Sequence, residues 1–166
     1  RNVIVNGQSD SFEDRNNIKI YKQNGIKYAF IAYTDGINGL TIPSGKEYLV
    51  NIYSDEQAKK DIDSIKDKVD VIIVSMHWGE EYTHNPTQKQ KRQAKYLSSL
   101  GVNLIIGSHP HVIMPVDYVG DTLVIYSLGN FISGQSPLGI AKIIGLMVGI
   151  DIVVNDNLSK KEQEKN

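Results

Sequence analysis

Two histidines separated by one residue are the side chains of this sequence best suited to chemistry. His109 and His111 flank Pro110 directly after the apolar run 102–106. In an extended backbone, residues i and i+2 project to the same side, so both rings should face one way. Neutral imidazole nitrogens are common ligands of divalent metal ions. The pair therefore predicts a metal site just past the end of a strand.

A third histidine occupies an equivalent place about 30 residues upstream, since His77 follows the apolar run 71–75. In open α/β sheets, ligands bind beyond the carboxyl ends of the strands. A single histidine there is more often a hydrogen-bonded loop residue, but three in equivalent places favour one shared site. Gly79 and Gly107 would allow close approach of the backbone. We therefore expect His77, His109 and His111 to surround one or two divalent ions.

The residues that follow His77 are candidates for supporting roles. Glu80 and Glu81 could hold a ligating ring from outside the metal's coordination sphere, although adjacent acids in a loop are commonly just solvated. Trp78 could contact a substrate, but a wall or packing role fits an indole better. His84 lies in a polar loop and is not included in the site.

Composition limits the function classes. The chain has 166 residues, 40% of them hydrophobic, which suits one globular domain, here residues 1–154, followed by a polar tail, 155–166. A net charge of -1 gives no basic field for nucleic acid. With no cysteine, disulfides and thiolate ligands are excluded. The longest apolar stretch, 139–154, carries Lys142 and Asp151 and is too short to span a bilayer, so it predicts a buried strand or strand pair.

The elements that must position the histidines follow from periodicity and turn residues. Asn24-Gly25 between the strands expected at 18–22 and 26–33 predicts a hairpin. We expect further strands at the positions 3–5, 48–53, 71–75, 102–106, 117–119 and 123–126. The rest of 1–17 should be loop.

Two helices are expected between the central strands. Ser54, with Gln57 three residues later, predicts a capped helix whose apolar face is Ala58, Ile62, Ile65 and Val69. A second helix should begin at Asn85 or Pro86 and end at Gly101. Alternating helices and buried strands predict an α/β fold with a mainly parallel sheet, flanked by antiparallel hairpins.

Several stretches in the same order resemble the bacterial capsule synthesis protein CapA family, which includes PgsA and is associated with poly-γ-glutamate production. The stretches are 75–82 (SMHWGEEY), 101–111 (GVNLIIGSHPH), 126–132 (YSLGNFI) and the loop 43–46 (PSGK). The resemblance runs from about Asn24 to Asp151, and the stretch 126–132 adds Asn130 as a candidate for contact with a ligating side chain or with the substrate.

This family resembles the calcineurin-like metallophosphoesterases, which implies a four-layer α/β/β/α sandwich with two divalent ions, such as Mn, Fe or Zn. The resemblance places His77 and His109 on one ion and His111 on the other. Two such ions can hold a hydroxide and polarise a phosphoryl oxygen.

The family's earlier motifs, which supply Asp, Asn and a further His, have no counterpart in this sequence. We therefore expect the sandwich to be incomplete on its N-terminal side and part of the ligand set to lie before Arg1. The resemblance also implies an extracytoplasmic protein at the cell surface, anchored through sequence before Arg1.

Three functions follow as alternatives. The first is a capsule or poly-γ-glutamate biosynthesis or export protein that works with other synthase subunits on an anionic polymer. The second is an active metal-dependent phosphoesterase on a small phosphodiester or nucleotide. The third is a non-catalytic subunit that binds polymer or partner through the surface around Trp78, Tyr82 and Phe131. Sequence leaves open whether the protein is an enzyme.

Overall fold

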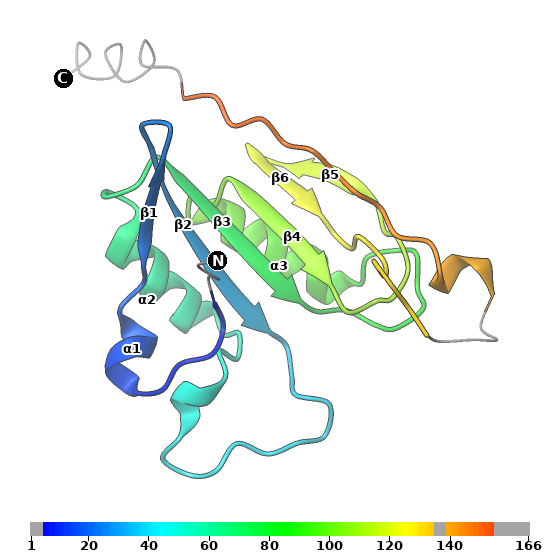
Figure 1. Ribbon diagram of the computed structural model, residues 1–166, viewed down its shortest axis with the longest axis horizontal. Helices are drawn as coiled ribbons and strands as arrows, with labels where there is room; N and C mark the ends of the chain where they lie inside the picture. The colour runs from blue at the N-terminus through cyan, green and yellow to red at the C-terminus, as the bar shows by residue number, and fades with distance from the viewer. Residues whose placement is uncertain (1–4, 135–138, 155–166) are drawn as a thin grey trace.

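A six-stranded sheet forms the centre of the fold (Figure 1). The computed structural model describes residues 5–134 and 139–154. In sheet order the strands are β1 Ile20–Gln23, β2 Ile26–Thr34, β3 Val71–His77, β4 Leu104–Ser108, β6 Thr122–Ile125 and β5 Val116–Val119. The central pairs from β2 to β6 are parallel, and β1 and β5 pair antiparallel at the edges. The predicted α/β class, with a parallel centre and flanking hairpins, is confirmed.

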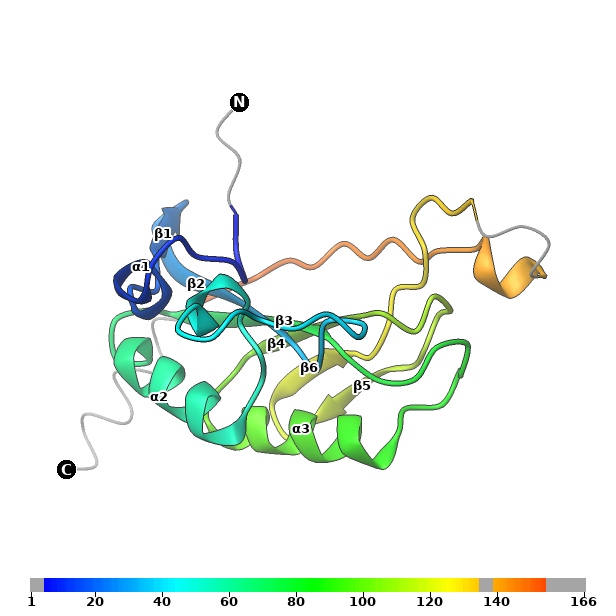
Figure 2. The ribbon, with the colours of Figure 1, turned by 90° about the horizontal axis from the view of Figure 1, so that it is seen from below.

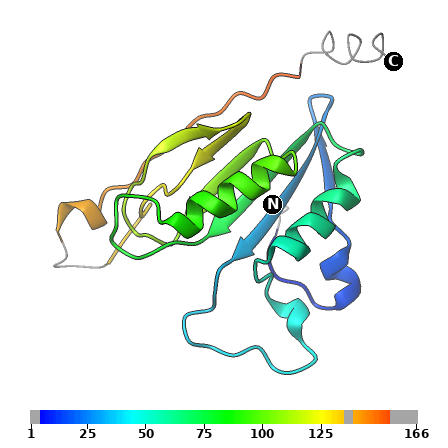
Figure 3. The ribbon, with the colours of Figure 1, turned by 180° about the vertical axis from the view of Figure 1, so that it is seen from behind.

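Two helices cover one face of this sheet, α2 Asp55–Ile65 and α3 Gln88–Ser99 (Figures 2 and 3). Ser54 caps α2 by accepting from the Gln57 amide, as predicted. Thr87, rather than Asn85 or Pro86, caps α3 and forms a reciprocal capping box with Gln90. The described helices include none that is both long and apolar enough to cross a membrane.

The predicted hairpin between β1 and β2 is present. Asn24 and Gly25 have φ of 50° and 87°. Two successive positive φ values are the signature of a type I′ turn, whose twist matches that of the paired strands. The hairpin starts the sheet, and β2 then carries the chain to the edge where the histidines lie.

Two predictions in the N-terminal third are wrong. The segment 48–53 is not a strand: it begins in a 3₁₀ turn, Glu47–Leu49, and only Ile52 forms a bridge, to Thr34. Its backbone is bonded to loops as well as to the strand end, with the Asn51 amide donating to Gly7. A short helix, α1 Phe12–Asn16, stands where loop was expected, capped by Ser11. The strand predicted at 3–5 lies outside the described residues except for Val5.

The apolar stretch 139–154 is not the buried strand or strand pair that was predicted. It contains a 3₁₀ turn, Ile140–Lys142, and a single bridge, Gly145 to Gly129. From 146 onward it runs extended across the face of the sheet opposite the helices, orange in Figure 2. Met147 and Val153 are 81% and 83% exposed. Of the four layers of the expected sandwich, the described residues supply one helical layer and one sheet.

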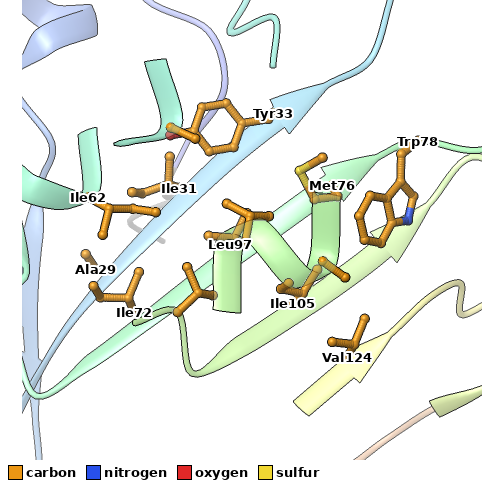
Figure 4. Packing of buried hydrophobic residues seen from close by; sticks show 14 of the residues in the cluster. Ala29, Ile31, Tyr33, Ile62, Ile72, Met76, Trp78, Leu97, Ile105 and Val124 are labelled. Atoms are coloured by element: carbon orange, nitrogen blue, oxygen red, sulfur yellow. The ribbon is translucent and has the colours of Figure 1, made fainter. Parts of the chain in front are cut away.

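The core lies between the sheet and the two helices (Figure 4). Its buried side chains include Ala29, Ile31, Tyr33, Ile62, Ile72, Met76, Trp78, Leu97, Ile105 and Val124. The strand residues among them alternate, so one face of each strand packs under α2 and α3. The core therefore holds β3 and β4 in fixed register; β3 ends at His77, and β4 leads directly into His109.

A buried ionic network joins α1, α2 and β2. The Asp61 carboxylate, 3% exposed, accepts hydrogen bonds from Arg15 at 2.9 Å, Tyr33 at 2.7 Å and Gln57 at 2.8 Å. A buried carboxylate with three donors is well compensated. The network fixes the position of α1 against the sheet.

Tyr33 gives this network a pH dependence. Burial, and then the charge and hydrogen bond of Asp61, raise the pKa of the Tyr33 hydroxyl far above its ordinary value. The unfolded chain releases that proton near pH 10, whereas the folded chain keeps it. Tyr33 should therefore contribute fully to stability below about pH 10, and that contribution should fall by up to about 1.4 kcal/mol per pH unit above it.

We expect urea unfolding from about pH 9 to about pH 11 to show this loss in the wild type and a smaller loss in Tyr33→Phe. Tyr118, which is 68% exposed, is the matched control for removing a tyrosine hydroxyl. Equal losses in wild type and Tyr33→Phe would contradict the prediction.

Candidate metal centre

The carboxyl ends of β3 and β4 bring two of the predicted histidines together. His77 is the last residue of β3 and pairs in register with Ser108, the last residue of β4. The chain continues directly to His109, and the His77 and His109 ring centroids are 4.5 Å apart. The Trp78 amide donates to the Ser108 carbonyl at 3.1 Å, which holds the two loops together.

His109 also lies beside His111 and Glu81. Each of these three residues has one potential ligand atom, a ring nitrogen or a carboxylate oxygen, and the three atoms lie within 4.8 Å of one another. Glu81, expected from sequence as a supporting residue, thus joins the group of potential ligands itself. Two imidazoles and one carboxylate suit Mn, Fe or Zn, so the residues present fit a divalent ion.

This grouping differs from the division that the family resemblance implied. The resemblance pairs His77 with His109 and assigns His111 to a second ion. The structure instead groups His109 with His111 and Glu81, and places the His77 ring next to His109. Which ion each histidine would bind stays a prediction.

The backbone reaches this arrangement in a way the sequence did not predict. His109 and His111 are not extended: their φ angles are 98° and 61°, and Tyr82 has a φ of 64°. Non-glycine residues adopt positive φ rarely, and such strain clusters at functional sites. The Tyr82 amide donates to the Pro110 carbonyl at 2.8 Å, which ties the two strained loops together.

Thr34 determines which nitrogen of His77 is free. The Thr34 hydroxyl donates to the Gly36 carbonyl at 2.6 Å, so its oxygen accepts from Nδ1 of His77 at 3.1 Å. The proton is then on Nδ1, and Nε2 keeps the lone pair that a metal ion needs. Thr34 is the register partner of His77 on β2. Sequence offered no signal for this role, because the contact is long-range.

Asn130 determines which ring nitrogen of His111 is free. Its amide nitrogen donates to the carbonyls of Lys142, at 2.8 Å, and His111, at 3.3 Å, which fixes the orientation of the amide. The remaining oxygen accepts from Nδ1 of His111 at 2.8 Å. Nε2 of His111 is again the free nitrogen. Asn130 is therefore placed to orient the His111 ring, as residues that hydrogen-bond a metal-ligating histidine do.

The surroundings of His77 lower its pKa and so favour the neutral ring. Burial, and then the neighbouring His109 and His111, lower the pKa of His77, while Asp35 raises it to a smaller extent. A neutral ring is the form that binds a metal ion.

A cavity of about 290 Å³ opens beside His77 and His109. Glu80 and Lys89 line it, together with Asp35, whose carboxylate accepts from Lys89 at 2.8 Å and Gln93 at 2.7 Å. Glu80 is thus placed at the cavity and outside the group of potential ligands.

Trp78 lies under the cavity beside His77 as a packing residue, the role that suits an indole better than substrate contact. Its side chain is fully buried, stacks on Tyr126 at 5.8 Å, and donates from Nε1 to the Tyr126 carbonyl at 3.0 Å. Its indole is a wall under the site. His84 is exposed, bonds to the Ile113 carbonyl at 3.0 Å and lies outside the group.

Comparisons with known proteins find curated relatives that are similar to this chain in sequence. The PGA biosynthesis protein CapA of Bacillus subtilis (strain 168) is 31% identical over 146 residues, covering 81% of this chain and 36% of that protein. The capsule biosynthesis protein CapA of Bacillus anthracis is 32% identical over 133 residues, covering 78% of this chain and 32% of that protein. The chain thus spans about a third of the length of these curated relatives.

A crystal structure of a proposed 5′-nucleotidase from Staphylococcus aureus, in complex with alpha-ketoglutarate, matches with a TM-score of 0.52 and 16% identity. The match covers 95% of this chain and 35% of the other. At this identity the similarity shows the fold alone. The sequence model of the family described as "Bacterial capsule synthesis protein PGA_cap" matches residues 1–135. The chain therefore belongs to the bacterial capsule synthesis protein family.

Proposed function

We propose that this chain supplies the histidine-bearing part of a divalent metal centre in a CapA-type protein of capsule or poly-γ-glutamate biosynthesis or export. The observation that carries the metal centre is the convergence of Glu81, His109 and His111 within 4.8 Å. Family membership supports the capsule role. The expected partners are an anionic polymer or a phosphate-containing small molecule, and other synthase subunits at the cell surface.

The residues of the chain have defined roles in this proposal. Glu81, His109 and His111 would hold the ion, with His77 beside His109 as a further ligand. When bound, a divalent ion acts as a Lewis acid on a phosphoryl or carbonyl oxygen and activates water. Thr34 and Asn130 keep Nε2 of His77 and His111 available. The cavity beside His77 gives a ligand access to the ion.

The direct test is metal binding by the intact protein, first stripped with chelator and then titrated with Mn, Fe and Zn. Retained metal measured by mass spectrometry should accompany thermal stabilisation, equivalent to about 2.7 kcal/mol when free metal is 100 times the dissociation constant. Absence of both would disprove the metal centre. Capsule production restored by a His77→Ala, His109→Ala double mutant would instead favour a non-catalytic, partner-binding role.

A metal-dependent phosphoesterase is the second candidate function. The cavity beside His77 and His109 favours it, because it gives a small ligand access to the potential metal ligands and is lined by Lys89, which pairs with Asp35. Turnover of a generic phosphodiester by the intact protein, lost in His109→Ala, would support this function. No turnover with saturating metal would contradict it.

A further inference from the structure

Lys142 lies close to the metal centre in a position that the proposed function leaves unused. It ends the 3₁₀ turn Ile140–Lys142, and its Nζ is 3.6 Å from the centroid of the Tyr82 ring. Within residues 5–134 and 139–154, the ion pairs of the structure do not include Lys142. The Lys142 ammonium contacts the face of an aromatic ring instead of a carboxylate.

Tyr82 connects this lysine to the potential metal ligands. Its ring stacks on His111 with centroids 5.8 Å apart and an interplanar angle of 25°. It also follows Glu81 directly in the chain, and its amide is bonded to the Pro110 carbonyl. The Lys142 ammonium is therefore one aromatic ring away from the group formed by Glu81, His109 and His111.

The backbone of Lys142 is anchored to the same group. Asn130 donates to the Lys142 carbonyl at 2.8 Å while its oxygen accepts from His111. A few residues further on, the Leu146 amide donates to the Leu128 carbonyl at 2.8 Å. These bonds fix where the lysine side chain starts, but its ammonium is held only by the ring face among the contacts described.

The resting contact is weaker than the one a ligand would offer. A partly exposed cation over an aromatic ring gains less than an ammonium that is hydrogen-bonded to an oxyanion. An anionic group placed near His111 would therefore draw Lys142 away from Tyr82. Lys89, beside His77, already pairs with Asp35 at 2.8 Å.

We propose that Lys142, resting on Tyr82, is a subsite for an oxyanion, a carboxylate or phosphate group, of the ligand bound at the metal centre. The inference rests on the proposed metal centre and deepens it, because it specifies the chemical class of the ligand and the residue that holds it. Carboxylate would come from a γ-linked glutamate polymer, and phosphate from a phosphoester.

The test is calorimetric titration of the metal-loaded intact protein with inorganic phosphate and, separately, with a γ-linked glutamate oligomer. Lys142→Gln should weaken binding of at least one of these ligands by about 10- to 100-fold, as for the loss of a hydrogen bond to a charged group. Lys142→Arg should keep most of the affinity. Lys60→Gln, on the exposed face of α2, is the matched control and should bind like the wild type.

A second measurement monitors the Lys142 side chain by NMR. In the free protein, the Tyr82 ring current should shift the Lys142 ε-methylene protons upfield in NMR spectra, and added ligand should reverse that shift. Weaker phosphate binding would identify a phosphate subsite, and weaker oligomer binding a carboxylate subsite.

Two results would overturn the inference while leaving the metal centre intact. One is normal metal content with unchanged affinity for both ligands in Lys142→Gln. The other is a wild type that holds metal but binds neither ligand. Loss of metal from Lys142→Gln would also overturn it, because the lysine would then support the metal site and not the ligand. Absence of metal from the wild type would instead disprove the proposed function.

Discussion

Replacing Gly107 with alanine is expected to destabilise the fold by about 3 kcal/mol or more. An added Cβ would lie 2.0 Å from the Tyr126 carbonyl oxygen and 2.5 Å from Trp78 Nε1. These two atoms are joined by a buried hydrogen bond of 3.0 Å. The methyl group would therefore break that bond and push apart β4 and the segment after β6. Because His109 follows two residues later, the metal centre should be lost as well.

Urea unfolding measures the first effect, and metal retention at a temperature where the variant is still folded measures the second. Gly149→Ala is the matched control, since its added Cβ would meet no atom within 4 Å and should change stability little. Wild-type stability in Gly107→Ala would show that the end of β4 can shift, contrary to the close packing of Trp78 against it.

The sheet could be predicted from sequence because local signals and global packing agree along its centre. The Asn24-Gly25 turn, the Ser54 cap and the alternation of helix with apolar strand each specify the same βαβ arrangement. In the segments 48–53 and 139–154 the apolar pattern was misleading. Their backbones are bonded mainly to loops, and their pairing is limited to single bridges, Ile52 to Thr34 and Gly145 to Gly129.

The site could be predicted only in part. Three histidines after two strands were visible in the sequence, because the residues after neighbouring parallel strands meet at one edge. The place of Glu81 among the potential ligands was not visible, since it depends on the strained backbone at Tyr82, His109 and His111. That strain is maintained by long-range bonds, such as Tyr82 to Pro110, which leave no periodic trace in sequence. The contacts of Thr34 with His77 and of Lys142 with Tyr82 are also long-range, so sequence did not indicate them.

His109→Ala is expected to have the largest effect on metal binding. His109 belongs to the group with Glu81 and His111, and its ring is also 4.5 Å from His77, so its loss affects every potential ligand of the site. Loss of an outer-shell partner alone reduces metal affinity by about 10- to 100-fold, and loss of a direct ligand should therefore cost at least about 100-fold. The measurement is a competition titration with a chromogenic chelator.

The fold should survive this change, because His109 is partly exposed and the strands before it are held by the core. Thermal unfolding without metal should be close to that of the wild type, and the stabilisation by added metal should disappear. His84→Ala is the matched control: it removes an exposed histidine, bonded to the Ile113 carbonyl, from outside the group and should leave affinity unchanged. Equal losses in His84→Ala and His109→Ala would mean that metal binds to surface histidines in general. Unchanged affinity in His109→Ala would mean that the ion, if bound, is held by other residues than Glu81, His109 and His111.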